Sequence, residues 1–396
     1  MKPIRDSVHE YITLGPVATE LLDTPTVQRL RHIKQLSTVR LVFPSANHTR
    51  FEHSLGVYHL AGELADHLDI DADTAAHLRA AALLHDVGHG PYGHQTERLI
   101  HRRTGKDHDE IEWLLTDADR PVCQVLERHG LDPERVAALI DGEGALGAIV
   151  SGELDVDRMD YLVRDAHHTG VPYGTIDHGR LIRDLRIEGE EPVLAEGNVA
   201  TAESLLLARS LMNAIVYRHH VPRIAGAMLE RASEEYLDRT DTTVEEFRRL
   251  PDHDLLVGLR ESVPELGERL EHRQLYKRAV WAGLEDVPTG TVDAGYEEER
   301  AAEREIADRA DIDPRQVIVD VPSRPTLKES ESKVIVNGVS RRLEDASELV
   351  GSLRATERAR WRLGVYCPAT NRETVARAAR DVLGVRGRGR TRHGVS

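Results

Sequence analysis

Cysteine, aromatic residues and lysine are all scarce in this chain of 396 residues. The two cysteines, Cys123 and Cys367, lie far apart, which excludes a disulfide framework and a thiolate metal site and favours a reducing compartment. Aromatic residues make up only 4% of the chain, so the core must consist mainly of Leu, Val, Ile and Ala. Acidic residues outnumber basic ones by 68 to 52, and only six of the 52 are Lys. This composition indicates either a halophilic protein from a cytoplasm of high salt or a GC-rich genome.

The sequence also lacks the apolar segments that direct a chain into or across a membrane. The N-terminus has no apolar core of a signal peptide, and no apolar run approaches the length of a bilayer span on inspection. We therefore expect a soluble, cytoplasmic protein with no membrane partner. The net charge of −16 is poorly suited to general nucleic-acid binding, since phosphates require clustered Lys and Arg. Any anionic ligand must bind in a local basic pocket.

Helical periodicity dominates the first two thirds of the chain. Between Pro16 and about Tyr236 apolar residues recur at helical spacing, and strand signals are scarce. The pattern predicts an all-helical body. Helices are predicted at Thr26–Leu36, Phe51–Leu68, Ala72–His85, Glu110–Leu115, Glu134–Ile140, Val156–Arg164 and Ala202–Tyr217.

The composition changes after about Trp281. A linker-like segment at Asp286–Gly295 precedes a charged helix at Glu297–Arg309. Short β-branched runs and an amphipathic helix follow, which predict a small α+β domain. These are Gln316–Val321, Lys333–Val336, Arg362–Tyr366 and Glu373–Leu383. We therefore predict a mainly-α chain with a helical body at 1–285, an α+β C-terminal domain at 286–383 and a disordered basic tail at 384–396. The tail is either solvated or an arm that touches nucleic acid.

Four stretches concentrate histidine and carboxylate side chains: Arg50–His53, His85–His94, His108–Asp109 and Asp155–Tyr161. Such ligands without thiolates suit Mn, Mg, Fe, Co, Ni or Zn, and do not decide among them. On a regular helix, adjacent residues point about 100° apart, so His85 and Asp86 can bind one ion only where the helix ends. The Gly- and Pro-containing segment that follows predicts such an end.

Each residue taken alone also has an ordinary interpretation. An isolated His53 is more often a helix histidine without special function, and a His-Asp dipeptide occurs by chance. The aspartates of Asp155–Tyr161 resemble a calcium loop superficially, but the central Gly and terminal Glu are absent. The co-occurrence of three histidines within His85–His94 at a Gly-rich helix end favours a functional site.

Longer strings around these stretches resemble one family. They are Asp23–Arg31, Ile33–Leu36, Arg50–Gly56, His85–Pro91, Asp155–Tyr161 and Arg164–His168. They resemble the HD-domain superfamily of metal-dependent phosphohydrolases, and within it the deoxynucleoside triphosphate triphosphohydrolases of the SAM-and-HD-domain type. The resemblance runs from about residue 2 to 383, with core motifs at 50–168, and we expect no SAM domain ahead of it.

The resemblance implies a divalent metal ion and a set of catalytic residues. His53, His85, Asp86 and Asp157 would hold the ion. In this family metal-activated water attacks the α-phosphorus of a dNTP and releases deoxynucleoside and tripolyphosphate. His94 would protonate the departing 5′ oxygen, a task that suits an imidazole. The other implied catalytic residues are His89, His108, Asp109 and Glu97.

A substrate pocket is implied in the same way. Residues near the phosphates would be Arg50, Arg158 and Arg209, and those of the deoxyribose pocket Gln35, Tyr161, Asp165 and Tyr217. A tyrosine against C2′ would leave no space for a 2′ hydroxyl. The sequence departs from the family at three positions: Asp109 replaces Glu, Glu97 replaces Asp and Arg158 replaces Lys, so the charge is kept while reach or geometry changes. Without the resemblance, the tyrosines would be core residues and the two acids ordinary surface groups.

The resemblance also implies regulation between subunits. In this type of enzyme a guanine nucleotide binds between subunits and promotes an active tetramer. The residues that match its guanine site are Asp23, Gln28, Arg31, Arg273 and Lys277. The adjoining second activator site looks impaired, because residues 190–201 contain no Lys or Arg. We therefore expect GTP or dGTP as an activator and a homo-oligomer, either a dimer or a tetramer.

Three functions follow from this sequence. The first is a metal-dependent dNTP triphosphohydrolase, which we favour. The second is an HD phosphohydrolase acting on another phosphoester, such as a nucleoside monophosphate or a cyclic nucleotide. The third is a catalytically silent nucleotide sensor, which would not need the complete set of metal ligands.

Overall fold

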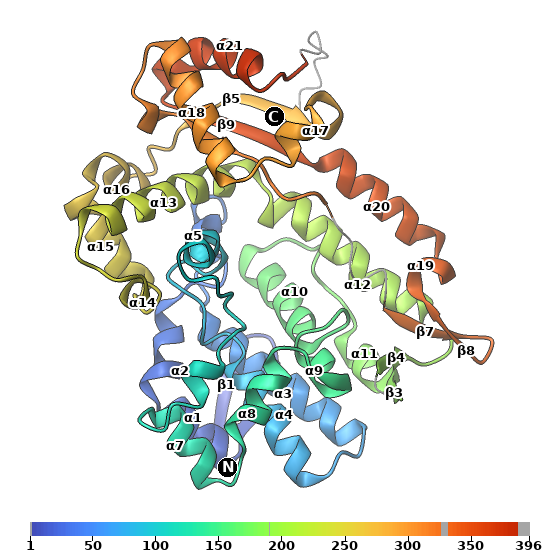
Figure 1. Cartoon of the computed structure of the whole chain (residues 1–396). Helices are drawn as coiled ribbons and strands as arrows, with labels where there is room; N and C mark the ends of the chain where they lie inside the picture. Colours follow the sequence, from blue (N-terminus) through green and yellow to red (C-terminus); the bar gives the residue numbers. More distant parts are fainter. Residues whose placement is uncertain (1, 190, 326–331, 387–396) are drawn as a thin grey trace.

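The computed structural model describes residues 2–189, 191–325 and 332–386. Helices form most of it, as predicted, and the C-terminal sheet lies at the end of the molecule opposite the N-terminus (Figure 1). The body helices up to α16 are α1 (Pro16–Leu22), α2 (Pro25–Arg29), α3 (Arg50–His67), α4 (Ala72–Leu84), α5 (His94–Thr104), α6 (Glu112–Leu115), α7 (Pro121–Arg128), α8 (Pro133–Ile140), α9 (Gly144–Val150), α10 (Val156–Thr169), α11 (His178–Asp184), α12 (Val199–Met212), α13 (His220–Arg239), α14 (Val244–Phe247), α15 (Asp252–Ser262) and α16 (Pro264–Glu271).

Three helices carry the predicted metal ligands, and local sequence sets where each begins. Thr49 and Glu52 form a reciprocal capping box at the start of α3. Asp71 accepts a hydrogen bond from the backbone of Thr74 at the start of α4, and Asp155 does the same for Arg158 at the start of α10. The long α3 packs against both α4 and α10 through a buried Leu- and Ala-rich core. The three helix ends that carry the ligands therefore lie together.

The body also contains two short hairpins that helical periodicity did not reveal. β1 (Lys2–Asp6) pairs antiparallel with β2 (Glu10–Leu14), and β3 (Leu185–Glu188) with β4 (Glu191–Leu194). The predicted helix at residues 26–36 is wrong in its second half. After α2 a short 3-10 turn (Leu30–His32) ends the helical backbone, and Lys34 forms an isolated bridge with Thr49.

The C-terminal part divides between two sheets. β5 (Lys277–Gly283), β9 (Arg362–Cys367) and β6 (Ile318–Asp320) form an antiparallel sheet in the order β5-β9-β6. The packing helices are α17 (Thr289–Val292), α18 (Tyr296–Ala310) and α21 (Arg372–Val382). The predicted division at residue 286 stays a prediction, and the place of β5 in this sheet points to a boundary ahead of Lys277.

The rest of the C-terminal part returns to the body. β7 (Lys333–Val336) pairs in parallel with β4 and antiparallel with β8 (Val339–Arg342), which completes a four-stranded sheet. Beyond it α19 (Leu343–Ala346) and α20 (Glu348–Arg360) pack against α12, and α20 leads back to the C-terminal sheet (Figure 1). Helical body and C-terminal part are thus interleaved.

Two further expectations need correction. The predicted disordered tail starts too early, because Val385 is buried and the backbone N–H of Arg386 donates to the carbonyl of Asp286 at 2.9 Å. Residues 387–396 of that tail lie outside the described residues. In addition, the helical segment Val199–Tyr217 is long and apolar enough to span a membrane, with a mean hydropathy of 1.3. It packs against α10, α11 and α20, as a core helix of a water-soluble protein also does.

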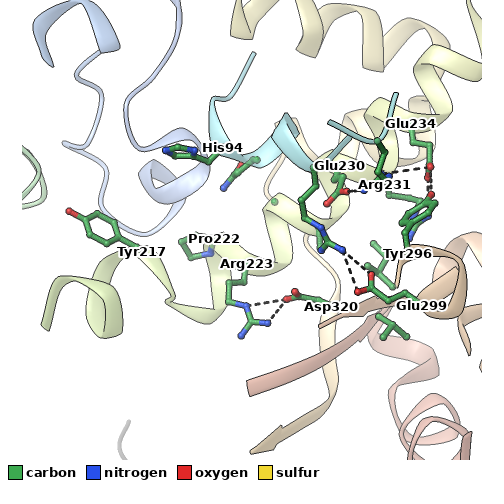
Figure 2. Close-up of a pocket in the computed structure, with 17 residues that line it drawn as sticks. His94, Tyr217, Pro222, Arg223, Glu230, Arg231, Glu234, Tyr296, Glu299 and Asp320 are labelled. Carbon is green, nitrogen blue, oxygen red and sulfur yellow. Dashed lines mark hydrogen bonds and ion pairs between the residues drawn. The ribbon is translucent and has the colours of Figure 1, made fainter. Parts of the chain in front are cut away.

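Ion pairs cross the junction between the body and the C-terminal part (Figure 2). Arg98 of α5 contacts Glu299 of α18 at 3.3 Å, and Arg223 of α13 contacts Asp320 of β6 at 2.6 Å. They border a pocket of about 250 Å³ that reaches His94. Burial raises the pKa of Glu299 to about 7, although Arg98 opposes the shift.

This shift predicts a pH-dependent stability. Folded Glu299 keeps its proton up to about pH 7, whereas an unfolded Glu loses it near 4.5, so the free energy of unfolding should fall as pH rises between these values. Glu299→Gln removes that decline. We expect the variant to match the wild type near about pH 5 and to exceed it by at most about 3 kcal/mol near about pH 8 in urea unfolding.

The control is Glu297→Gln, which makes the same charge change at an exposed position of α18. Its stability should follow the wild-type pH dependence. Parallel pH curves for Glu299→Gln and wild type would contradict the shift.

Candidate active site

The predicted metal ligands converge at the meeting point of α3, α4 and α10. His53 lies in the first turn of α3, His85 is the residue that ends α4, and Asp157 lies in the first turn of α10. The side chains of His53 and His85 are buried, and that of Asp157 is 32% exposed. The site is therefore open on the side of Asp157.

The chain turns sharply after α4, and this turn lets two adjacent side chains reach one point. A Cβ added at Gly88 would lie 2.0 Å from the carbonyl oxygen of His108, so only glycine permits this close approach. The helix end expected from the sequence is confirmed, and His85 Nε2 lies 3.5 Å from Asp86 Oδ1.

The distances between donor atoms suit a single cation. His53 Nε2 lies 2.9 Å from Asp157 Oδ1, 3.3 Å from His85 Nε2 and 3.8 Å from Asp86 Oδ2. The Nδ1–H of His85 donates to the carbonyl of Ala82 at 2.9 Å, so its Nε2 faces the cluster. Asp86 Oδ2 is buried, and within the described ranges it has no hydrogen-bond partner. Two imidazoles and two carboxylates around such an unpaired oxygen fit a divalent ion.

The electrostatics of the cluster favour positive charge at its centre. Burial works to raise the pKa of Asp86, but Arg50, His85 and His89 hold it well below its ordinary value. Burial works to lower the pKa of His53, but the hydrogen bonds that its ring donates to Asp157 and Asp160 raise it to about 10. Burial works to raise the pKa of Asp157 too, but His53 lowers it below its ordinary value. Both carboxylates are therefore ionised at neutral pH, as metal ligands must be.

The predicted catalytic histidines form a second group around Glu97 beside this cluster. His94 donates from Nδ1 to Glu97 at 2.6 Å, and His108 forms an ion pair with the other oxygen of Glu97. The ring of His89 stacks on that of His108 at 3.9 Å and lies with Nε2 3.2 Å from Asp86 Oδ1. The side chain of His94 is 65% exposed.

Charge divides unequally within this group. Burial and the cation of Arg50 hold the pKa of His89 well below its ordinary value, so His89 is neutral. Burial works to lower the pKa of His108, but Glu97 raises it above its ordinary value. Burial works to raise the pKa of Glu97, but its bonds to His108 and His94 lower it. The predicted partner Asp109 lines an open pocket of about 580 Å³ together with His94, Glu97 and His108. Its charge also works to raise the pKa of His108.

The residues predicted for the deoxyribose pocket continue along α10. Asp157, Tyr161 and Asp165 recur every four residues, which places them on one helix face over roughly 12 Å. The hydroxyl of Tyr217, in the π-helical turn Asn213–Tyr217, donates to Asp165 at 2.8 Å, and its ring lies 6.2 Å from that of Tyr161. Gln35 contributes a buried side-chain oxygen that has no hydrogen-bond partner among the described residues.

The arginines predicted to bind phosphates act on different groups of the site. Arg50 donates to Asp86 Oδ1 at 2.8 Å and is buried, and Arg158 donates to Asp155 at 2.7 Å. Both therefore already neutralise protein carboxylates. Burial raises the pKa of Tyr161 and of Tyr217, and the charge of Arg209 works against both shifts, so Arg209 lies near the two rings.

The predicted guanine-site residues fall into two groups in the single chain. Arg31 donates to Gln28 at 2.9 Å next to Asp23, at the corner between α1 and α2. Arg273 donates to the carbonyl of Leu41 after α16, and Lys277 begins β5. A nucleotide site between subunits remains a prediction.

The sequence patterns missed two residues that support the site, the buried His48 and the half-buried Arg29. His48 donates from Nε2 to Asp165 at 2.8 Å and stacks on His168 at 4.3 Å. Arg29 donates to the backbone carbonyls of His89 and of residues 248–250, and thereby holds the loop that carries His89. Arg29 lies within one of the recognised strings, so its signal was present without an assigned role.

Comparisons with known proteins agree with this geometry. The HD domain matches residues 50–165, the span that supplies all four predicted ligands, and an HD-associated region matches residues 176–393. The chain belongs to the HD-domain phosphohydrolase family. This HD protein is 32% identical over 379 residues to an uncharacterised protein of Methanocaldococcus jannaschii, covering 93% of this chain and 79% of that one.

Two further relatives of this HD protein carry functional names. The human deoxynucleoside triphosphate triphosphohydrolase SAMHD1 is 28% identical over 375 residues, which cover 78% of this chain and 59% of that protein. A phosphohydrolase of Bacteroides thetaiotaomicron has a similar solved structure, with a TM-score of 0.73 and 25% identity over 93% of this chain and 100% of that one.

Two substitutions should separate metal binding from electrostatic support. We expect His85→Ala to weaken Mn²⁺ binding about 100-fold or more, with the metal-free protein unfolding near the wild-type temperature. Asp86→Ala should also lose the metal, and should in addition destabilise the metal-free protein by about 3–5 kcal/mol because Arg50 is left buried without its counter-charge. Isothermal titration calorimetry and urea unfolding measure the two effects.

The control is His253→Ala, at a side chain that is 63% exposed. Undiminished Mn²⁺ binding by His85→Ala would contradict the assignment of this cluster.

Proposed function

We propose that this HD protein is a metal-dependent hydrolase of dNTPs that releases deoxynucleoside and tripolyphosphate. The observation that carries the proposal is the strip on α10. Asp157 ends the strip at the candidate metal cluster, and Tyr161 and Asp165 continue it to the ring and hydroxyl of Tyr217. A nucleotide whose phosphates lie at the cluster would have its sugar against these side chains.

The roles we propose follow from what each group can donate or accept. A bound divalent ion would polarise a phosphoryl oxygen and activate water. Tyr161 and Tyr217 would enclose C2′ and leave no space for a 2′ hydroxyl, while Asp165 and Gln35 would accept or donate at the 3′ hydroxyl. Arg209 would neutralise the phosphates, with help from Arg50 and Arg158 where their bonds to Asp86 and Asp155 allow.

We propose His94 as the group that gives a proton to the departing 5′ oxygen. Its Nδ1 donates to Glu97, and its ring is open to the neighbouring pocket. His108 pairs with the other oxygen of the same carboxylate. The donor atoms of His89, His94, Glu97 and His108 lie close enough to hold a cation too. We favour proton transfer, because both oxygens of Glu97 are already joined to imidazoles.

The first experiment identifies the products. Purified protein with Mn²⁺ or Mg²⁺ is given each of the four dNTPs, and anion-exchange chromatography separates nucleosides, nucleotides and tripolyphosphate. We expect deoxynucleoside and tripolyphosphate, and about a 10- to 100-fold lower kcat/KM for Arg209→Ala, since a charge-assisted contact to phosphate is lost.

The matched control is Arg377→Ala, an exposed arginine of α21, which should keep wild-type activity. Intact dNTPs from a folded, metal-loaded sample would contradict the proposal. Turnover of a nucleoside monophosphate or a cyclic nucleotide that is insensitive to Arg209→Ala would support the alternative phosphoester reaction, and metal binding without any turnover would support a nucleotide sensor.

We further propose that GTP or dGTP activates the enzyme by joining subunits through Asp23, Gln28, Arg31, Arg273 and Lys277. We also propose that the protein is cytoplasmic and halophilic and that it forms dimers or tetramers. Arg31 already lies over the ring of Phe51 at 3.6 Å, which fixes it near Gln28.

The activator proposal predicts a nucleotide-dependent mass. Light scattering with dGTP should report a larger particle than without it for the wild type and for Arg377→Ala. The double variant Arg31→Ala, Arg273→Ala should keep the smaller mass, because two cations of the site are lost. A wild-type mass that dGTP leaves unchanged would rule the activator site out.

A further inference from the structure

A buried carboxylate on α10 connects the metal cluster to the N-terminal hairpin. Asp160 is completely buried and accepts four hydrogen bonds. His53 donates from Nδ1 at 2.8 Å and His9 from Nε2 at 2.7 Å, to different oxygens. Arg164 donates to both oxygens, at 2.8 and 2.9 Å. Asp160 is therefore fully satisfied, and the positions of its two oxygens are fixed by three side chains.

The bond from His53 decides which of its nitrogens faces the cluster. An ionised carboxylate can only accept, so Nδ1 of His53 must carry the hydrogen. Its Nε2 is thereby directed at Asp157 and His85. Carboxylates that accept from a metal-binding histidine fix its tautomer and ring orientation in this way. The orientation of His53 thus depends on where Asp160 is held.

The hairpin supplies the partner on the other side of Asp160. His9 lies in the turn between β1 and β2, and its side chain is 3% exposed. Asp6 fixes this turn, because its Oδ1 accepts from the backbone of Val8 and His9 at 2.8 Å each. Asp6 also pairs with Arg164 at 2.9 Å. Turn, arginine and carboxylate form one closed network.

The facing helix leaves room for this network at a single position. A Cβ added at Gly56, one turn after His53 on α3, would lie 1.8 Å from Asp160 Oδ1 and 2.5 Å from Arg164. Alanine at this position would have to displace the carboxylate. Gly56 therefore permits the contact between α10 and α3 on which His53 depends.

We propose that His9 is a positioning residue of the metal site, which acts by holding Asp160 against His53. The N-terminal hairpin is then part of the active centre, although His9 itself contacts neither metal nor substrate. The proposal rests on the proposed metal-dependent function, but its test measures metal binding alone.

The test compares three variants of the full-length protein. His9→Ala removes the donor to Asp160. His9→Gln restores a donor, because the amide nitrogen of Gln occupies nearly the same place as Nε2 of His. His59→Ala is the matched control. The ring of His59 lies 5.1 Å from that of His9, but its ion pair is to Glu63 and not to Asp160.

We expect His9→Ala to weaken Mn²⁺ binding about tenfold in isothermal titration calorimetry, as is common when an outer partner of a histidine ligand is lost. His9→Gln should recover most of the affinity, and His59→Ala should bind like the wild type. The visible absorption of bound Co²⁺ should change in His9→Ala and not in His59→Ala, since it reports ligand orientation.

Unfolding of the metal-free proteins separates positioning from general stability. If His9→Ala and His59→Ala lose similar stability, a difference between their metal affinities comes from the changed orientation of His53 and not from a general loss of stability. Wild-type Mn²⁺ affinity and an unchanged Co²⁺ spectrum in His9→Ala would overturn the proposal, as would a loss that His9→Gln fails to rescue. Because no substrate is used, a protein that binds metal in this pattern but leaves dNTPs intact would refute the proposed reaction and not the role of His9.

Discussion

The ion pair between Arg50 and Asp86 is the constraint on which the rest of the site depends. It joins the first turn of α3 to the end of α4 inside the protein, where both side chains are buried. Arg50 donates to Oδ1 of Asp86, which also lies near His85 and His89. The other oxygen, Oδ2, has no hydrogen-bond partner among the described residues and faces His53. The same guanidinium lies against Gly93, where an added Cβ would be 2.6 Å from it. The position of the loop before α5 therefore also depends on this ion pair. The predicted metal cluster and the Glu97 histidine group are thereby held side by side.

Buried charge elsewhere in the molecule is arranged in the same paired manner. Arg164 joins Asp160 to the N-terminal hairpin, and Arg231 joins α13 to Glu303 of α18 at 2.7 Å. Arginine suits these places because its planar fork can serve two carboxylate oxygens at once. Removing one partner of such a pair leaves the other charge buried and uncompensated, which strongly destabilises the folded protein. An Arg-rich and Lys-poor composition therefore has a structural use here, whatever the salt of its surroundings.

The mainly-α fold and the elements that carry the site could be predicted from local pattern. The helix around His53 and the end of the helix at His85 depend on residues close in sequence, namely Thr49, Glu52 and the glycines that follow Asp86. Other predictions failed where tertiary contacts decide. The helix expected to reach residue 36 stops early, because Lys34 pairs with Thr49 and its backbone donates to Asp252, which lies 218 residues away. The domain division at residue 286 stays a prediction. β5 lies ahead of it in the sequence, and its partner β9 comes about 80 residues later.

The sequence by itself determined the residue types and local geometry of the site: histidines and carboxylates at helix starts and ends, without thiolates, in strings that resemble one family. Only the tertiary structure decided how those side chains are oriented. Asp160 belonged to a stretch that the sequence singled out, yet its bond to His9 spans 151 residues and leaves no periodicity to detect. The physical reason is that helix propensity and capping act within a few residues, whereas the direction of a buried imidazole is set by whichever charged groups the fold brings against it.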